Sequence, residues 1–151
     1  QNDIISSLNQ DMINDIKSLQ REYESLTTEL CVETEMAIDS SCLIVFDYEY
    51  QEHASKVDID TEEFTAVCPW TGLPDFGTLE VSYVPNLSCL ELKSLKYYLM
   101  SYRNVGIVQE HAASRILNDL VNVCNPVKMT VDLDYGIRGG IHTRVSVNYP
   151  K

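Results

Sequence analysis

The chain has 151 residues with a formal net charge of -12, and 44% of the residues are hydrophobic. This length suits one domain with a sizeable buried core. No apolar run approaches the roughly 20 residues that a membrane-spanning helix needs, so we expect no membrane partner and a cytoplasmic protein. The acidic charge disfavours direct binding to nucleic acid and leaves a small-molecule ligand as the better expectation.

The N-terminal segment has a helical pattern. From Ile5 to Leu26 the apolar residues recur at steps of three and four, which places them on one stripe of a helix. We expect an amphipathic helix of about six turns, packed on the domain or on another copy. Residues 1–40 are therefore predicted to be a helical extension and linker, and residues 41–151 the main domain.

The rest of the chain alternates between strand and helix patterns. Extended segments are predicted at 42–50, 56–64 and 79–83, helices at 92–102 and 112–123, and a closing hairpin at 127–135 and 141–149. This order of strand, strand, helix, helix, strand, strand is typical of an α+β domain in which helices cover one face of an antiparallel sheet. The open edges of such a sheet are commonly closed by neighbouring subunits, so we expect a ring-like homo-oligomer.

The cysteines are odd in number and widely spaced. They are Cys31, Cys42, Cys68, Cys89 and Cys124. There is no Cys-x-x-Cys pair and no Cys/His cluster at zinc-ligand spacing, so we expect neither a disulfide framework nor a bound metal.

Cys68 is the first candidate for chemistry. It lies where a strand runs into a loop rich in Pro and Gly, a place where a side chain is held by a scaffold and stays reachable. A thiolate is a strong nucleophile, and Asp75 closes the same loop. On spacing alone, both residues also fit an ordinary turn.

Other candidates lie farther along the chain. Glu110 begins the second predicted helix, where it either favours the helix dipole or accepts N–H donors from a heterocyclic base. Lys93 and Lys96 share one helix face, which is either a solvated basic face or a phosphate site. Arg138 precedes a Gly-Gly turn and can be a plain hairpin residue. No Gly-x-Gly-x-x-Gly motif follows a strand, so a nicotinamide cofactor is not expected to bind in the Rossmann manner.

Several motifs together resemble one family. They are Glu63–Pro69, Thr71–Gly72, Pro74–Phe76, Glu91–Tyr98, Ser101–Asn104, Asn118–Leu120 and Arg138–Ile141. In this order and at these separations they resemble the 7-cyano-7-deazaguanine reductases, the QueF family, in its single-module form. The resemblance covers about residues 56–148.

The resemblance implies a tunnelling fold, related to that of GTP cyclohydrolase I, whose subunits form a ring, or two stacked rings, with active sites between them. It implies reduction of a nitrile to a primary amine with two NADPH, in the biosynthesis of the modified tRNA base queuosine. By position, Cys68 is the nucleophile and Asp75 the acid/base. The substrate-binding residues are Glu110, Glu91 and Gln109. The cofactor-binding residues are Lys93, Ser94, Lys96, Arg138 and Gly139.

The chemistry of a nitrile makes specific demands on these residues. Addition of the Cys68 thiolate to the nitrile carbon gives a thioimide, and the nitrogen must gain a proton as the sulfur adds. An ordinary Asp, with a pKa near 3.9, carries almost no proton at pH 7. We therefore hypothesise that burial raises the pKa of Asp75, so that it takes the thiol proton and passes it to the nitrogen.

One position departs from the family pattern. The family usually has Phe-His-Glu where this chain has Val108-Gln109-Glu110, and Gln109 cannot exchange a proton at neutral pH. His111 would point away on a helix. Gln-Glu also resembles GTP cyclohydrolase I, but the zinc-binding residues of that enzyme are missing. Two alternatives are an archaeosine-type amidinotransferase, which adds ammonia to the same thioimide and has no need of the Glu91–Tyr98 motif, and a non-catalytic base-binding ring.

Overall fold

The computed structural model describes Ser18, Arg21 and residues 30–151. The chain divides into two compact units, Gln1–Cys31 and Val32–Lys151. The amphipathic helix predicted between Ile5 and Leu26 lies largely outside the described residues. The second unit is the domain considered below.

An antiparallel sheet of four strands is the base of the domain, in the order β2-β3-β5-β6. Its strands are β2 (Val57–Val67), β3 (Pro74–Val84), β5 (Lys128–Tyr135) and β6 (Arg144–Tyr149). Along β3 and β5 buried and more exposed residues alternate, as expected for a sheet with one covered face. The extended segments predicted at 56–64 and 79–83 and the closing hairpin are therefore present.

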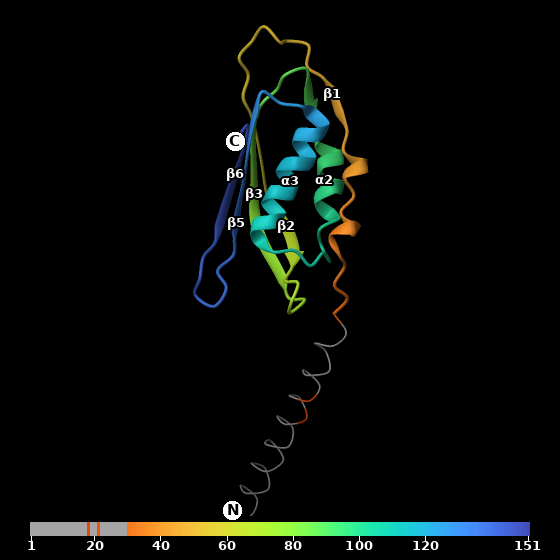
Figure 1. The fold of residues 1–151 in the computed structure, drawn as a ribbon, viewed down its shortest axis with the longest axis vertical. Coiled ribbons are helices and arrows are strands. Elements are labelled where there is room, and N and C mark those ends of the chain that lie inside the picture. Colours follow the sequence, from red (N-terminus) through yellow and green to blue (C-terminus); the bar gives the residue numbers. More distant parts are fainter. Residues whose placement is uncertain (1–17, 19–20, 22–29) are drawn as a thin grey trace, which may run out of the picture. The chain divides into compact units, whose positions relative to one another are not determined.

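Two helices cover one face of this sheet (Figure 1). Helix α2 (Leu92–Met100) and helix α3 (Gln109–Cys124) bury most of the apolar stripes on which their prediction rested, although Leu92 is 59% exposed. Asn125, at a φ of 43° in the left-handed region, ends α3 immediately before Pro126. The predicted α+β class, with helices on an antiparallel sheet, is confirmed. No helix in the described residues is long and apolar enough to cross a membrane.

A second, small sheet was only partly predicted. Strand β1 (Val45–Asp47) is shorter than the extended segment expected over 42–50, and it pairs with β4 (Ser88–Leu90) instead of joining the large sheet. Before it come two short 3₁₀ turns, Glu35–Ala37 and Ser40–Cys42. The sequence pattern did not indicate β4, because three residues are too few to show a period.

Residues 32–40 pack on the domain, although the sequence placed them in a linker. The Glu33 N–H donates to the Asn104 carbonyl (2.8 Å), and the Gly106 N–H donates to the Glu33 carbonyl (2.9 Å). Ile38 joins the hydrophobic core. The segment thus supports the chain between α2 and α3.

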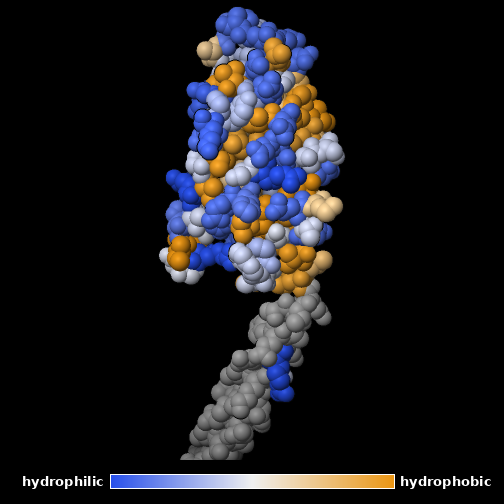
Figure 2. All heavy atoms as spheres, viewed as in Figure 1, coloured by the Kyte–Doolittle hydropathy of each residue, from blue (hydrophilic) through white to orange (hydrophobic). Residues whose placement is uncertain are grey.

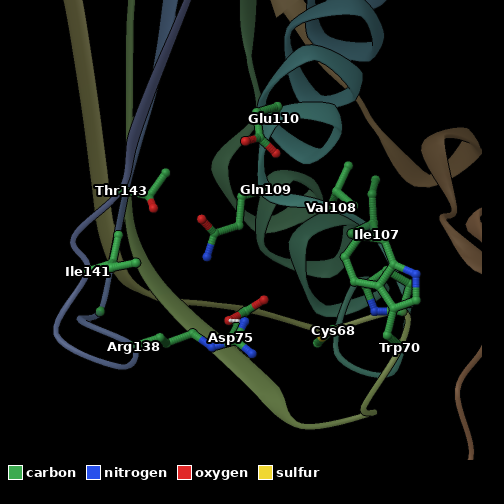
Figure 3. A pocket seen from close by; sticks show the side chains of 12 residues that line it. Cys68, Trp70, Asp75, Ile107, Val108, Gln109, Glu110, Arg138, Ile141 and Thr143 are labelled. Atoms are coloured by element: carbon green, nitrogen blue, oxygen red, sulfur yellow. Dashed lines mark hydrogen bonds and ion pairs between the residues drawn. The ribbon is translucent and has the colours of Figure 1, made fainter.

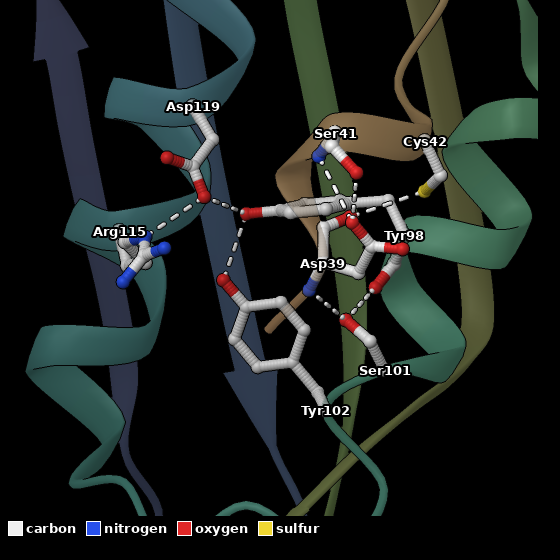
Figure 4. Close-up of polar contacts among 8 residues, drawn as sticks. All are labelled: Asp39, Ser41, Cys42, Tyr98, Ser101, Tyr102, Arg115 and Asp119. Atoms are coloured by element: carbon white, nitrogen blue, oxygen red, sulfur yellow. Dashed lines mark hydrogen bonds and ion pairs between the residues drawn. The ribbon is translucent and has the colours of Figure 1, made fainter. Parts of the chain in front are cut away.

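A buried polar network joins the two helices (Figure 4). The Tyr98 hydroxyl donates to Asp119 Oδ2 (2.8 Å), and Tyr102 shares a hydrogen bond with Tyr98 (2.8 Å). Arg115 Nε donates to the same Asp119 oxygen (2.8 Å). Burial raises the pKa of Tyr98 and Tyr102, so both stay neutral donors. The network ties the middle of α3 to Tyr98 of α2 and to Tyr102 just after it.

The surface keeps several exposed hydrophobic side chains. Figure 2 shows hydrophobic residues along the side of the domain where β1 lies. Ile44 and Phe46 are more than half exposed there. Strands β2 and β6 also end the sheet without a neighbour among the described residues.

Candidate active site

The turn between β2 and β3 holds Cys68 and Asp75 on one face. Asp75 pairs with Ala66 across the hairpin, and Cys68 follows Ala66 by two residues. Because side chains alternate along a strand, Ala66, Cys68 and Asp75 point to the same face, which is the helix side. The turn is closed by hydrogen bonds from Cys68 N to the Leu73 carbonyl (2.9 Å) and from Gly72 N to the Cys68 carbonyl (2.8 Å).

The start of helix α3 is tied to the same turn. Val67 N donates to the Val105 carbonyl (3.0 Å), and Ile107 N donates to the Val67 carbonyl (3.2 Å). Gly106 permits this close approach, since a Cβ there would lie 3.2 Å from the Cα of Pro69. The residues that follow, including Gln109 and Glu110, are thereby brought beside Cys68.

These elements enclose a cavity of about 360 Å³. Cys68, Asp75, Gln109, Glu110 and Arg138 line it (Figure 3), and the largely exposed Trp70 forms one side. The volume is in the range of small-molecule sites. The structure thus brings together four of the residues expected to act on the substrate, Cys68, Asp75, Gln109 and Glu110.

Asp75 is buried, as hypothesised, but it also has a cationic partner. Arg138 Nη1 donates to Asp75 Oδ1 at 2.5 Å, with the Asp75 side chain 5% exposed and the Arg138 side chain 44% exposed. Arg138 lies in the loop between β5 and β6, where Gly139 and Gly140 adopt φ angles of 56° and 79°. The resemblance assigned Arg138 to the cofactor, and no sequence signal placed it in the Cys68 cavity. Its contact to Asp75 spans 63 residues of the chain.

The pKa of the Cys68 thiol is lowered from its ordinary value to about 7. The largest cause is a hydrogen bond from the Thr71 side chain; smaller ones come from the backbone N–H groups of Trp70 and Thr71 and from Arg138. Together they outweigh burial, which acts in the opposite direction. The lowered pKa makes the thiolate more accessible near neutral pH, which suits a nucleophile.

Glu110 and Gln109 occupy the first turn of α3 and face the cavity. The Gln109 carbonyl accepts a hydrogen bond from the Tyr135 hydroxyl (3.4 Å). His111 is exposed and does not line the cavity, as its place on the helix predicts. The residue that differs from the family pattern, Gln109, is therefore at the site, and the nearby histidine does not replace it.

In the Glu91–Tyr98 motif, two side chains serve the fold. The Glu91 carboxylate caps α2 by accepting from Lys93 N (2.9 Å) and Ser94 N (2.7 Å). The N–H groups of Ser94 and Lys93 lower the pKa of Glu91. The Ser94 hydroxyl, which is buried, accepts from Ile44 N (3.0 Å) and donates to the Glu91 carbonyl (2.8 Å). Glu91 and Ser94 thus join α2 to the start of β1.

Lys93 and Lys96 are exposed on α2, and Lys96 forms an ion pair with Glu63. Lys96 also lies at a groove of about 210 Å³ with an apolar lining that includes Ile59 and Leu95. No residue of α2 lines the Cys68 cavity. Within one chain the expected cofactor lysines and the nucleophile therefore occupy two separate places.

The sequence predicts neither a bound metal nor a disulfide framework. The described residues contain no group of three or more His, Cys, Asp or Glu that could hold a metal ion. All five cysteines lie in the described part of the chain, and each is a free thiol.

The fold and the cavity define a class: a tunnelling-fold chain with a cysteine and an aspartate at a pocket for a small molecule. The family model of QueF-like proteins matches residues 74–151. The chain is 53% identical over 107 residues to the NADPH-dependent 7-cyano-7-deazaguanine reductase of Chlorobaculum tepidum, which covers 71% of this chain and 92% of the relative. It is 54% identical over 114 residues to the protein of that name from Caldicellulosiruptor bescii (76% of this chain, 87% of the relative).

A solved structure of similar fold is that of the archaeosine synthase QueF-Like in the apo form. It matches with a TM-score of 0.59 and 25% sequence identity, over 64% of this chain and 94% of the other. The chain belongs to the QueF family of NADPH-dependent 7-cyano-7-deazaguanine reductases.

Proposed function

We propose that this protein reduces the nitrile of 7-cyano-7-deazaguanine to the aminomethyl group, with two NADPH, in the biosynthesis of queuosine. The observation that carries the proposal is the meeting of Cys68, Asp75 and Glu110 at one cavity. The chain also shares about half of its aligned residues with relatives of that name. The cavity is large enough for one bicyclic base.

Each residue at the cavity has a distinct task. The Cys68 sulfur adds to the nitrile carbon, a C–S bond forms, and one C–N π bond breaks. The electron pair moves to the nitrogen, which takes a proton through Asp75 and completes a thioimide. Glu110 accepts hydrogen bonds from N–H groups of the base and so orients the nitrile toward Cys68.

The α2 motif fits the proposed cofactor by the chemistry of its side chains. Exposed Lys93 and Lys96 suit phosphate groups, and the apolar groove beside Lys96 suits a flat ring. When bound, NADPH supplies hydride to the carbon of the thioimide. Because no α2 residue reaches the Cys68 cavity in the same chain, the lysines that serve one cavity belong to a neighbouring subunit.

This division supports a homo-oligomeric ring with sites between subunits. The edges of β2 and β6, which have no neighbouring strand in the part of the chain that the structure describes, and the exposed apolar residues beside β1 supply surfaces for it. The substrate is the free base, so the reaction needs no direct contact with tRNA. We place the protein in the cytoplasm.

A second candidate is the amidinotransferase activity, favoured by the likeness to the archaeosine synthase structure. That reaction would use the same thioimide and add ammonia. The higher identity to the reductases supports hydride transfer instead.

One assay separates the candidates. The protein is mixed with 7-cyano-7-deazaguanine while NADPH absorbance and the mass of the Cys68 peptide are followed together. The reductase gives an adduct and consumes two NADPH per nitrile. An adduct that incorporates ammonia without loss of NADPH indicates the transferase, and no adduct indicates a base-binding ring. The Cys68→Ala variant is the control, because it can form no adduct.

A further inference from the structure

Arg138 lines the Cys68 cavity and contacts Asp75, but the proposed reaction gives it no role. Its guanidinium reaches from the β5–β6 loop across the cavity to Asp75 (Figure 3). The loop is held at its base by hydrogen bonds from Gly136 N to the Phe76 carbonyl (2.9 Å) and from Tyr135 N to the Thr143 carbonyl (3.0 Å). Arg138 N and the Ile141 carbonyl close the loop tip at 3.0 Å. Arg138 is therefore presented to Asp75 by an ordered hairpin.

The contact engages only one oxygen of the carboxylate. Arg138 donates to Oδ1, and no hydrogen bond to Oδ2 is found within the described part of the chain. In that part, no polar side-chain atom is both fully buried and without a partner. Oδ2 of Asp75 is therefore open to the cavity, on the side where the nitrile would lie.

We propose, resting on the function above, that Arg138 is a positioning residue for proton transfer: it clamps Asp75 through Oδ1 and leaves Oδ2 free to carry the proton of the Cys68 thiol to the nitrile nitrogen. The proton balance is closed. One proton leaves the thiol, passes through Oδ2 and ends on the nitrogen as the C–S bond forms.

Charge in the cavity supports this role. The titratable and charged groups that face Cys68 are Asp75 from β3, Arg138 from the β5–β6 loop and Glu110 from α3, with Tyr135 of β5 nearby. Arg138 is the only cation that lines the described cavity. It is also one of the groups that lower the pKa of Cys68. Without it, Cys68 and Asp75 would share a cavity with Glu110 and no compensating charge.

The first test is alkylation of Cys68 as a function of pH, in the full chain without substrate. Iodoacetamide is used, and the Cys68 peptide is quantified by mass spectrometry so that other thiols do not contribute. In Arg138→Met the midpoint is expected to rise by about one pH unit, because loss of the nearby cation favours the protonated Cys68 thiol. In Arg138→Lys, which keeps the positive charge, the midpoint should return most of the way to the wild-type value.

The matched control is Arg144→Met. Arg144 forms a comparable ion pair with Asp134 on the same hairpin but does not line the Cys68 cavity. The midpoint of Cys68 alkylation in Arg144→Met should stay at the wild-type value. An unchanged midpoint in Arg138→Met, or an equal shift in Arg144→Met, overturns the proposal.

The second test follows adduct formation with 7-cyano-7-deazaguanine in the absence of NADPH. In the wild type the rate should fall as pH rises through about 7, because the Cys68 thiol loses the proton that the nitrogen needs. In Arg138→Met the fall moves to higher pH, so the ratio of the rates at pH 8 and pH 6 rises about fivefold. If separate steady-state measurements showed that Arg138→Met raises only the KM for NADPH and leaves the adduct profile unchanged, Arg138 would be a cofactor residue and the clamp would be refuted.

The two tests separate the proposals from each other. If the wild type forms no adduct at any pH, the proposed function fails, while the alkylation profile still decides the role of Arg138. If the adduct forms and its pH profile is the same in Arg138→Met, the function stands and the clamp fails.

Discussion

The Cys68 cavity and the start of helix α2 both contain residues assigned to chemistry, yet they are built in different ways. The cavity gathers side chains from a turn, a strand, a helix start and a second loop. The α2 motif is one continuous segment, and two of its members, Glu91 and Ser94, are engaged in capping and in holding Ile44. The cavity depends on contacts between distant segments, whereas the Glu91 cap of α2 is made within the motif itself.

The α2 motif contains two kinds of residue. Two side chains of the α2 motif, Lys93 and Lys96, remain exposed for a ligand. Exposed lysines beside an apolar groove suit a phosphorylated cofactor. Ser94 is buried and holds the helix that presents these lysines. Mutations at the cavity should therefore affect the chemical step. Mutations in the α2 motif should affect either cofactor binding or the stability of the fold.

The largest effect among the following predictions is expected for Asp75→Asn. Loss of the proton carrier should slow adduct formation by about 10²- to 10⁴-fold. The rate of appearance of the Cys68 adduct measures this directly, and the melting temperature checks that the fold is kept. An unchanged adduct rate would remove Asp75 from the proposed reaction.

Glu110→Gln should weaken substrate binding more than it slows the bound complex. Hydrogen bonds to a charged acceptor contribute about 1.5–3 kcal/mol, which corresponds to roughly a 10- to 100-fold rise in the apparent Kd for the base. Titration of the Cys68→Ala protein with 7-cyano-7-deazaguanine, with and without Glu110→Gln, measures binding apart from chemistry. Equal affinities would show that Glu110 does not hold the base.

Much of the fold could be predicted from sequence periodicity. The long strands show a clear period of two residues and both helices a period of about 3.6 residues. The structure contains each of these elements. The pairing of β1 with β4 could not be predicted, because each strand has three residues and their contact spans the interval between Asp47 and Ser88. The packing of Glu33 and Ile38 depends on contacts with distant partners that no local pattern records.

The site was predicted in part, for a similar reason. Cys68 and Asp75 belong to one hairpin, so their proximity follows from local register. The approach of Glu110 depends on the bonds between Val67 and the segment around Gly106, which only the folded chain forms. The contact of Arg138 with Asp75 joins the β5–β6 loop to strand β3 across 63 residues of the chain, and the motif around Arg138 gave no indication of that partner.

The two kinds of residue in α2 can be separated by a pair of substitutions. Lys96→Ala should raise the KM for NADPH up to about tenfold with little change in melting temperature, since its ion pair with Glu63 is exposed. Ser94→Ala should lower the free energy of unfolding by about 1–3 kcal/mol, because Ile44 N loses its buried acceptor. Its effect on the KM should be the smaller of the two. A larger rise in KM for Ser94→Ala would identify the hydroxyl as a cofactor contact.

The smallest effect is expected for Gln109→His, which introduces the residue usual in the family at this place. Gln109 lines the cavity, so the new imidazole would lie within reach of the proton pathway between Cys68 and Asp75. A histidine titrates near pH 6.5, whereas the amide does not. The rate of nitrile reduction should therefore acquire an additional pH dependence near that value, with a change in rate of less than about tenfold. Steady-state rates between pH 5.5 and 8, with His111→Gln as the matched control outside the cavity, measure it. If both variants keep the wild-type profile, the side chain at position 109 takes no part in proton transfer, and hydrogen bonding to the substrate is its remaining role.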